Sequence, residues 1–226
     1  MKAPMTTSAK SPDEIARAYR SPPWWYDLRG FFILTFAYRS TLGRMVQFFA
    51  NNMGAEHLEL ACGTGTLLEF QMKWRRRHRM PNVKLTGVDY AESMLAGAIR
   101  RFRKLSKWRF VHGDVAHLPF NSALFDSVSI ANSIHCFSDV KMALDETYRV
   151  LKPGGSFAAN ILLFPSGSWI EKLIAERINL WGIRKGILVS PFEQATIRAH
   201  LLDAHFEIIS EKISGNCYYV CARKPT

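Results

Sequence analysis

The chain has 226 residues, of which 48% are hydrophobic, and it carries a formal net charge of +11. This length suits one α/β domain, and the apolar content excludes a disordered chain. The charge is compatible with nucleic acid, with an anionic membrane surface, or with a solvated basic surface that has no partner.

Other bulk features exclude further classes. The four cysteines form no CxxC pair, and no His or Cys stands at metal-ligand spacing, so we expect no metal and reduced thiols in a cytoplasmic protein. No apolar run approaches the roughly 20 residues that a membrane span needs. The first residues are small and polar, so we expect no secretory signal.

The first 52 residues predict a tail and a helical lid. Ser11-Pro12-Asp13-Glu14 has the pattern of a capping box and predicts a short helix to about Arg20. Residues 24–52 are rich in aromatic side chains and predict one or two more helices. We expect the main domain to occupy residues 53–226.

From residue 57 onward, short apolar strands alternate with helices. The predicted strands are residues 57–61, 83–88, 109–112, 127–132 and 156–164. Apolar residues recur at helical spacing over 91–105 and 140–151. Repeated βα units of this kind predict a parallel sheet with helices on both faces.

The end of the chain predicts a helical cap and a closing hairpin. Residues 165–190 form an insertion with an amphipathic helix, Ser190-Pro191-Phe192-Glu193 reads as a second capping box, and residues 206–213 and 217–223 read as an antiparallel pair. The predicted fold is a Rossmann-like, seven-stranded, mostly parallel sheet with an N-terminal lid and an inserted cap.

The strongest motif follows the first predicted strand. An apolar strand runs into Gly63-Thr64-Gly65, where glycines allow a ligand to lie against the backbone and leave free N–H groups at a helix start. The third glycine of a dinucleotide-binding loop is absent, because position 68 is Leu68. Glu59 precedes the loop, and a carboxylate there suits an ammonium-bearing ligand better than a pyrophosphate.

Two further acids follow the next strands. Asp89 ends the second strand, where a carboxylate accepts hydrogen bonds from ribose hydroxyls; the alternative is a cap for the following helix. Asp114 lies just past the third strand, in position to accept from the exocyclic amine of adenine while Val115 packs on the ring.

In this order the motifs resemble the UbiE-like, small-molecule branch of class I S-adenosylmethionine-dependent methyltransferases. That family shows LDLGCGTG, GVDxSxxML, GDAxxLPF, FDxVxxxxxLHH and RVLKPGG, and the counterparts here are residues 58–65, 87–95, 113–120, 125–136 and 149–155. The resemblance covers about residues 56–164. Ala61 replaces the usual first glycine of the loop, which adds only a methyl group, and Cys136 replaces the second His of the LHH element.

The resemblance implies that S-adenosylmethionine lies over the carboxyl ends of the strands. It implies Glu59, Gly63 and Gly65 around the methionine part, Asp89 on the ribose, and Asp114 with Val115 at the adenine. The complete predicted cofactor-binding set is Glu59, Ala61, Gly63, Gly65, Asp89, Tyr90, Met94, Asp114, Val115, Asn132 and Ser133.

Two residues are candidates for the transfer step. His135 follows the fourth strand and is a candidate general base because an imidazole titrates near neutrality; a structural role is the alternative. Tyr26 stands where related enzymes close a lid over the cofactor, and helix packing is its alternative.

The composition of the lid and cap favours an apolar or aromatic small-molecule acceptor, since pockets for such ligands are lined by similar side chains. We therefore expect methyl transfer to a natural product, quinone or lipid-like molecule, with the methylated atom left open, by a monomer or homodimer. Two basic clusters, over residues 73–79 and 100–109, are expected to be solvated, with transient contact to anionic lipid or nucleic acid as the alternative. The alternative functions are an RNA methyltransferase and a non-catalytic binding protein of the same fold.

Overall fold

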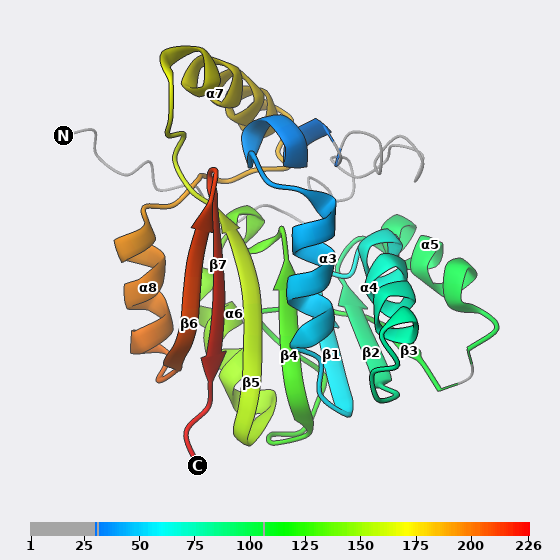
Figure 1. The fold of residues 1–226 in the computed structure, drawn as a ribbon. Coiled ribbons are helices and arrows are strands. Elements are labelled where there is room, and N and C mark those ends of the chain that lie inside the picture. Colours follow the sequence, from blue (N-terminus) through cyan, green and yellow to red (C-terminus); the bar gives the residue numbers. More distant parts are fainter. Residues whose placement is uncertain (1–29, 31, 106) are drawn as a thin grey trace.

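The protein is built on one seven-stranded sheet. A computed structural model describes residues 30, 32–105 and 107–226. The strand order is β3-β2-β1-β4-β5-β7-β6 (Figure 1). The strands are β1 (Glu56–Leu60), β2 (Lys84–Asp89), β3 (Arg109–His112), β4 (Phe125–Ala131), β5 (Leu151–Leu162), β6 (Glu207–Ser214) and β7 (Cys217–Arg223). The first five run parallel and β7 is antiparallel to both its neighbours, which confirms the predicted sheet.

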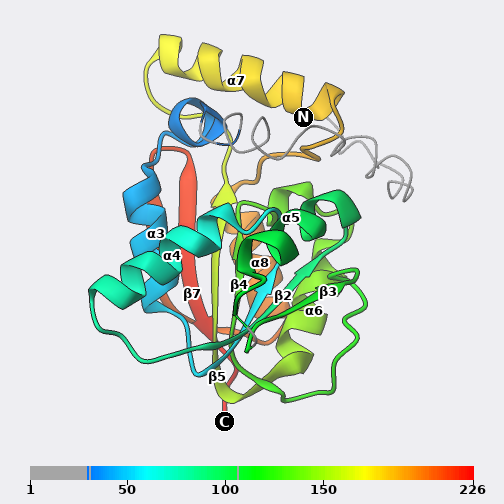
Figure 2. The ribbon, with the colours of Figure 1, turned by 90° about the vertical axis from the view of Figure 1, so that its right-hand side faces the viewer.

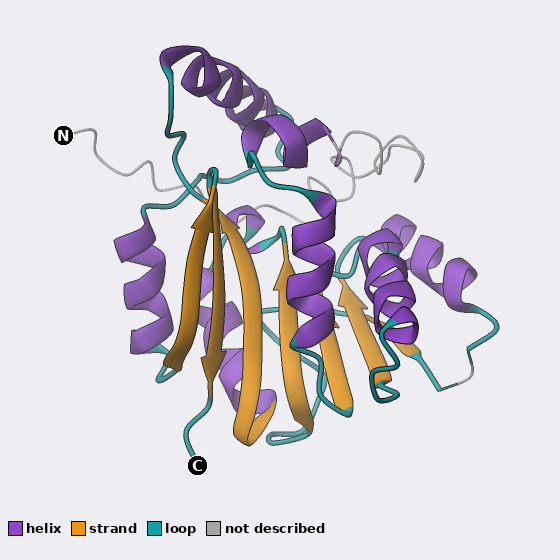
Figure 3. Cartoon of the chain, in the orientation of Figure 1, coloured by secondary structure: helices purple, strands orange, loops and turns teal. Residues whose placement is uncertain are grey.

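Helices cover both faces of the sheet (Figure 3). On one face lie α3 (Leu42–Asn51), α4 (Thr66–Arg77) and α5 (Glu92–Phe102); on the other lie α6 (Val140–Val150) and α8 (Gln194–Asp203). The helical periodicity explains this arrangement, because Met94, Leu95, Ala98 and Phe102 form the buried side of α5. Although α3 falls within the segment expected to form the lid, its Phe49 is fully buried in the core beside the sheet.

Two further elements lie beyond the carboxyl ends of the parallel strands. They are η1 (Ile33–Ala37), a single π-helical turn, and α7 (Trp169–Arg184), the predicted cap helix, and they pack against each other (Figure 2). Arg39 joins the two segments through an ion pair of 2.6 Å with Glu171. The cap therefore lies over the edge of the sheet where the motif residues end.

Two element boundaries differ from expectation. β5 begins at Leu151 rather than near 156, directly after α6 ends. The predicted capping box at 190–193 is wrong, because Ser190 donates its hydroxyl to the carbonyl of Pro191 and α8 begins after Glu193 without a side-chain cap. The true capping box joins Ser168 and Glu171 at the start of α7. The predicted helix near residues 11–20 and Tyr26 lie outside the described residues.

Candidate functional site

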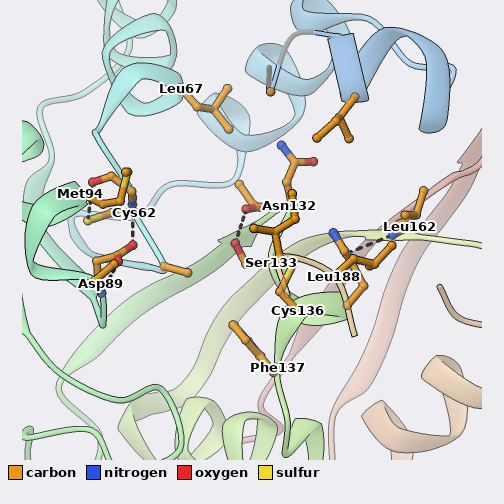
Figure 4. Close-up of a pocket in the computed structure, with 18 of the residues that line it drawn as sticks. Cys62, Leu67, Asp89, Met94, Asn132, Ser133, Cys136, Phe137, Leu162 and Leu188 are labelled. Atoms are coloured by element: carbon orange, nitrogen blue, oxygen red, sulfur yellow. Dashed lines mark hydrogen bonds between the residues drawn. The ribbon is translucent and has the colours of Figure 1, made fainter. Parts of the chain in front are cut away.

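A cavity of about 670 Å³ opens at the carboxyl ends of β1, β2 and β4 (Figure 4). This is where the strand order reverses, the usual place for a ligand in an open α/β sheet. Residues of η1, α3 and α7 line it from the side opposite the sheet. The predicted residues that line it are Glu59, Ala61, Gly63, Asp89, Tyr90, Met94, Asp114, Val115, Asn132, Ser133 and His135.

The two glycines of the loop have different physical roles. Gly63, at φ +56°, has no heavy atom within 4 Å of the position that a Cβ would take, and it borders the cavity. Gly65, at φ +74°, is not among the residues lining the cavity; a Cβ there would lie 2.6 Å from the Phe102 ring. Gly63 therefore leaves room for a ligand, whereas Gly65 allows α4 and α5 to pack closely.

The backbone of Ala61 is strained. Its φ is +53°, in the left-handed region that costs a residue with a Cβ roughly 1–2 kcal/mol. This strain could not be predicted from the sequence, because the turn as a whole determines the φ angle of Ala61. Strained residues of this kind cluster at ligand sites, and Ala61 lines the cavity.

Asp89 organises the glycine loop from the neighbouring strand. Its Oδ2 accepts a hydrogen bond of 2.7 Å from the Gly63 N–H, and its Oδ1 accepts one of 2.8 Å from the Ala91 N–H. Burial raises the pKa of the Asp89 carboxyl, and these two backbone donors oppose that shift. The expected alternative role as a cap is thus present in part, at the turn before α5, while the carboxylate still borders the cavity.

Glu59 is held by a chain of buried polar side chains on β1 and β4. His57 and Glu59 are the register partners of Ser127 and Ser129. The Gly54 N–H donates to Ser127 Oγ at 2.7 Å, and Ser127 Oγ lies 2.7 Å from His57 Nδ1. On the other side of the ring, His57 Nε2 lies 2.9 Å from Ser129 Oγ, which is 2.8 Å from Glu59 Oε2.

Three of these hydrogen bonds have a defined direction. The Gly54 N–H donates to Ser127 Oγ, and the Ser129 hydroxyl donates to Glu59 Oε2. Because the single Ser129 hydroxyl hydrogen is used in this way, Ser129 Oγ accepts from the Nε2–H of His57. One oxygen of Glu59 is tied to the sheet, and the carboxylate borders the cavity.

Asp114 and Val115 lie at the side of the cavity formed by the turn after β3. Asp114 is exposed, and its Oδ1 accepts a hydrogen bond of 2.9 Å from the Ala116 N–H. Tyr90 and His112 meet nearby, with ring centroids 5.8 Å apart. Together with Asp89, these residues give this side of the cavity acceptor groups and an aromatic ring.

Asn132 directly follows β4 and has a strained backbone conformation at the middle of the cavity (Figure 4). Its φ is +54°, a region that Asn tolerates better than most residues. Asn160 of β5 holds it there, accepting from the Asn132 N–H at 2.8 Å and donating to its side-chain oxygen at 2.5 Å. The chain then turns away from the sheet, and Ser133 and Cys136 border the cavity beside it (Figure 4).

The side chain of His135 is buried. Its Nε2 lies 2.5 Å from the Tyr38 hydroxyl, and its Nδ1 accepts from the Leu162 N–H at 3.4 Å. Because a backbone N–H can only donate, the proton of the neutral ring lies on Nε2 and points at Tyr38. Burial lowers the pKa of His135 to about 3, so the expectation of a near-neutral imidazole is wrong.

The far side of the cavity is apolar and comes from elements that the motifs do not reach. Its residues include Ile33, Leu34, Met45, Leu162, Ile178 and Leu188. Figure 4 shows Asp89, Cys62 and Met94 on one side, Asn132 and Ser133 between, and Leu162 with Leu188 on the other. Tyr38 belongs to this half and is not among the predicted site residues, because only its aromatic character is visible in the sequence.

Comparison with known sequences indicates a methyltransferase, the class that the motifs resemble. The sequence model of a family described as "Methyltransferase domain" matches residues 58–155. The demethylmenaquinone methyltransferase of Thermus thermophilus is 39% identical over 109 residues, covering 48% of this chain and 46% of that protein. The enzyme of the same name from Staphylococcus aureus is 28% identical over 151 residues, covering 67% and 61%. The chain thus spans about half to three-fifths of the length of these relatives.

Solved structures share the fold. Phosphoethanolamine N-methyltransferase 2 of Haemonchus contortus, in complex with S-adenosylmethionine, aligns with TM-score 0.72 and 14% identity over 97% of this chain and 61% of that one. The cyclase SpnF aligns with TM-score 0.63 and 19% identity over 81% and 80%. Identities this low establish the fold alone, and the presence of a cyclase shows that this fold supports different reactions.

The motifs, the strand order and the matching sequences all indicate the same class of protein. The chain contains a Rossmann-like domain of the class I S-adenosylmethionine-dependent methyltransferases. Its motifs and its sequence matches support the UbiE-like branch of that class. The site fits S-adenosylmethionine on its own geometry, because the open space at Gly63 and the acids Glu59, Asp89 and Asp114 all border one side of one cavity.

Proposed function

We propose that this protein transfers a methyl group from S-adenosylmethionine to a small apolar or aromatic molecule. The observation that carries this proposal is the composition of the cavity lining, in which Glu59, Asp89, Asp114 and the glycine loop lie on or just after the neighbouring strands β1, β2 and β3, and an apolar wall comes from residues 33–45 and 162–188. The polar part of the lining matches a charged cofactor, and the apolar wall matches an apolar acceptor.

The polar side would hold the cofactor. Glu59 suits its ammonium group, Asp89 its ribose hydroxyls, and Asp114 the exocyclic amine of adenine, while Gly63 leaves room for the chain between them. When bound, the sulfonium supplies an electrophilic methyl group. The protein's own contribution is to orient the two molecules and to exclude water, which is sufficient for large rate effects.

The apolar side would hold the acceptor, with His135 acting on Tyr38 rather than on the acceptor. The lone pair of His135 Nδ1 is occupied by the Leu162 N–H, and the Nε2 proton faces the tyrosine oxygen. A neutral imidazole in this arrangement fixes the position of the Tyr38 hydroxyl. The general-base role first considered for His135 is therefore replaced by a positioning role in this proposal.

Demethylmenaquinone is the first acceptor to test, since it appears in the names of the matching relatives. The family match does not include the acceptor side, however. Residues 33–45 and 162–188 supply the apolar wall, and both lie outside residues 58–155. The acceptor is therefore proposed as a chemical class, of which an apolar quinone is one member.

RNA as the acceptor has less support. Two members of the basic clusters have structural roles, since Arg75 is buried and donates to the carbonyls of Ala50 and Pro81, and Arg101 donates to the Thr64 carbonyl. The remaining charges of α4 gather at its C-terminal end, away from the loop that borders the cavity.

The test is methyl transfer from labelled S-adenosylmethionine to a panel containing short-chain demethylmenaquinone, simple phenols, apolar amines and unmodified RNA. Incorporation into an apolar small molecule supports the proposal. Incorporation into RNA alone, or cofactor binding without transfer to any member of a broad small-molecule panel, supports one of the alternatives.

A further inference from the structure

The side of α7 that faces away from the protein is apolar and exposed. Trp169 is 74% exposed, Ile170 and Leu180 are 50% exposed, and Leu173, Ile174 and Ile183 are 42–43% exposed. With Trp181, which is 37% exposed, seven large apolar side chains on this 16-residue helix exceed the scattered single residues that a protein surface normally shows. They form a continuous surface, which we call the α7 outer face.

Helical geometry places two arginines within this face. Ala175, Asn179 and Gly182 are the buried residues of α7 and define its inner side. At 100° per residue, Arg177 and Arg184 lie opposite them, flanked by the exposed apolar residues. Both arginines are exposed. Of the two acids of the helix, Glu171 pairs with Arg39, and the exposed Glu176 lies between Trp169 and Ile183 at one side of the face.

We propose that the α7 outer face docks on the surface of an anionic lipid bilayer. Tryptophan and aliphatic side chains combined with arginine are the composition of helices that lie in the membrane interface, where the rings and chains enter the headgroup region and the guanidinium groups meet lipid phosphates. No helix of the described residues is long and apolar enough to cross a bilayer. The helix would therefore lie on the membrane, parallel to its plane.

The same helix connects this surface to the cavity. Ile178, Asn179 and Gly182, on the inner side of α7, line the cavity whose apolar wall we assign to the acceptor. Docking would place the opening near the apolar phase in which a lipid-like acceptor dissolves. The docking itself does not depend on the proposed reaction, because vesicle binding is measured without cofactor or acceptor.

Charge favours a bilayer over a second copy of this chain. In a two-fold symmetric dimer through the centre of the α7 outer face, Arg177 and Arg184 of one copy would face the same residues of the other, with two arginines and one acid, Glu176, from each copy. An anionic bilayer offers phosphates to both. The basic cluster at the C-terminal end of α4 has charge without a comparable apolar surface, so it is a suitable control.

The experiment is co-sedimentation of the full chain with vesicles of phosphatidylcholine alone or mixed with phosphatidylglycerol. We expect binding to the mixed vesicles that weakens with added salt. Leu173→Ser with Leu180→Ser should reduce binding at least tenfold. Arg177→Gln with Arg184→Gln should reduce it by about fivefold per arginine and remove the preference for anionic lipid.

The matched control is Arg76→Gln with Arg77→Gln, which removes the same charge from exposed positions on α4 and should leave vesicle binding nearly unchanged. Thermal melts establish that each variant is folded. Absence of vesicle binding by the wild type, or an equal loss in the α4 variant, would overturn the proposal. A dimer in solution that dissociates in the Leu173 and Leu180 variant would assign the face to a second copy instead.

Discussion

The Tyr38 hydroxyl lies 2.5 Å from Nε2 of His135, and the two rings meet edge to face with centroids 5.5 Å apart. Tyr38 follows η1 and His135 follows β4, so this contact joins the lid side of the cavity to the sheet. Since Nδ1 of His135 is engaged by the Leu162 N–H, the ring is held at both nitrogens. A histidine held in this way is suited to orienting a partner.

If His135 acts through Tyr38, the two residues form one functional unit. Tyr38→Phe and His135→Gln should each lower kcat by about 10²-fold, the scale of a misplaced reacting group, while cofactor affinity stays nearly constant. The double variant should be no worse than the slower single variant. Multiplicative losses in steady-state kinetics would show that the residues act independently.

The buried imidazole should also make folding stability depend on pH. The pKa of His135 is lowered in the folded protein to about 3, against 6.5 for an ordinary histidine. Between these values the unfolded chain binds the additional proton, so stability is complete above about pH 6.5 and falls as the pH decreases, by up to about 1.4 kcal/mol per unit.

Urea unfolding of the wild type and of His135→Gln, measured at several pH values, tests this dependence because the other titrating groups are common to both proteins. The difference between the two stabilities should shrink as the pH falls below about 6. A constant difference down to pH 4 would mean that His135 is not buried in neutral form.

The two loop glycines should respond differently to the same substitution. Gly65→Ala places a Cβ 2.6 Å from Phe102 at a positive φ and should cost about 2–4 kcal/mol of stability, through strain and overpacking together. Gly63→Ala meets no protein atom within 4 Å, so it should cost less stability but weaken cofactor binding. Chemical denaturation and calorimetry on both variants separate the effects; a reversed order would contradict the assigned roles.

The sheet, the glycine loop and the acids at the strand ends could be predicted because each is carried by a short, local pattern. Glu59, Asp89 and Asp114 all follow apolar strands, and parallel strands bring their carboxyl ends to one edge. The capping box at the start of α7 has an equally local pattern, Ser168 with Glu171 three residues later, whereas the same pattern at residues 190–193 does not form a capping box.

The contacts that complete the site depend on tertiary structure. Tyr38 and His135 are 97 residues apart, and nothing local predicts that they meet. The series of hydrogen bonds that links Gly54 to Glu59 depends on the register of β1 against β4, which places Ser127 beside His57. Burial of His135 likewise follows from the cap and β5, so its ordinary pKa was the wrong starting point for the mechanism.

The series of buried, hydrogen-bonded side chains on β1 and β4 allows a further test of the assigned cofactor site. Ser129→Ala removes the donor to Glu59 Oε2, and Glu59→Gln removes the negative charge. Both should weaken binding of S-adenosylhomocysteine by roughly 5–150-fold, the range for losing partners of a charged group. Binding of 5′-methylthioadenosine, which lacks the amino acid part, should change little. Equal losses for both ligands would place Glu59 away from the ammonium group.

We infer that the cavity at the ends of β1, β2 and β4 holds S-adenosylmethionine through Asp89. The measurement that decides this is calorimetric titration of S-adenosylhomocysteine into the wild type and into Asp89→Ala. We expect one site per chain in the wild type and a loss of about 1–3 kcal/mol in the variant, since two backbone donors and the ribose lose their acceptor. No binding by the wild type, or the same affinity in a folded Asp89→Ala variant, would show that Asp89 does not hold the cofactor in this cavity.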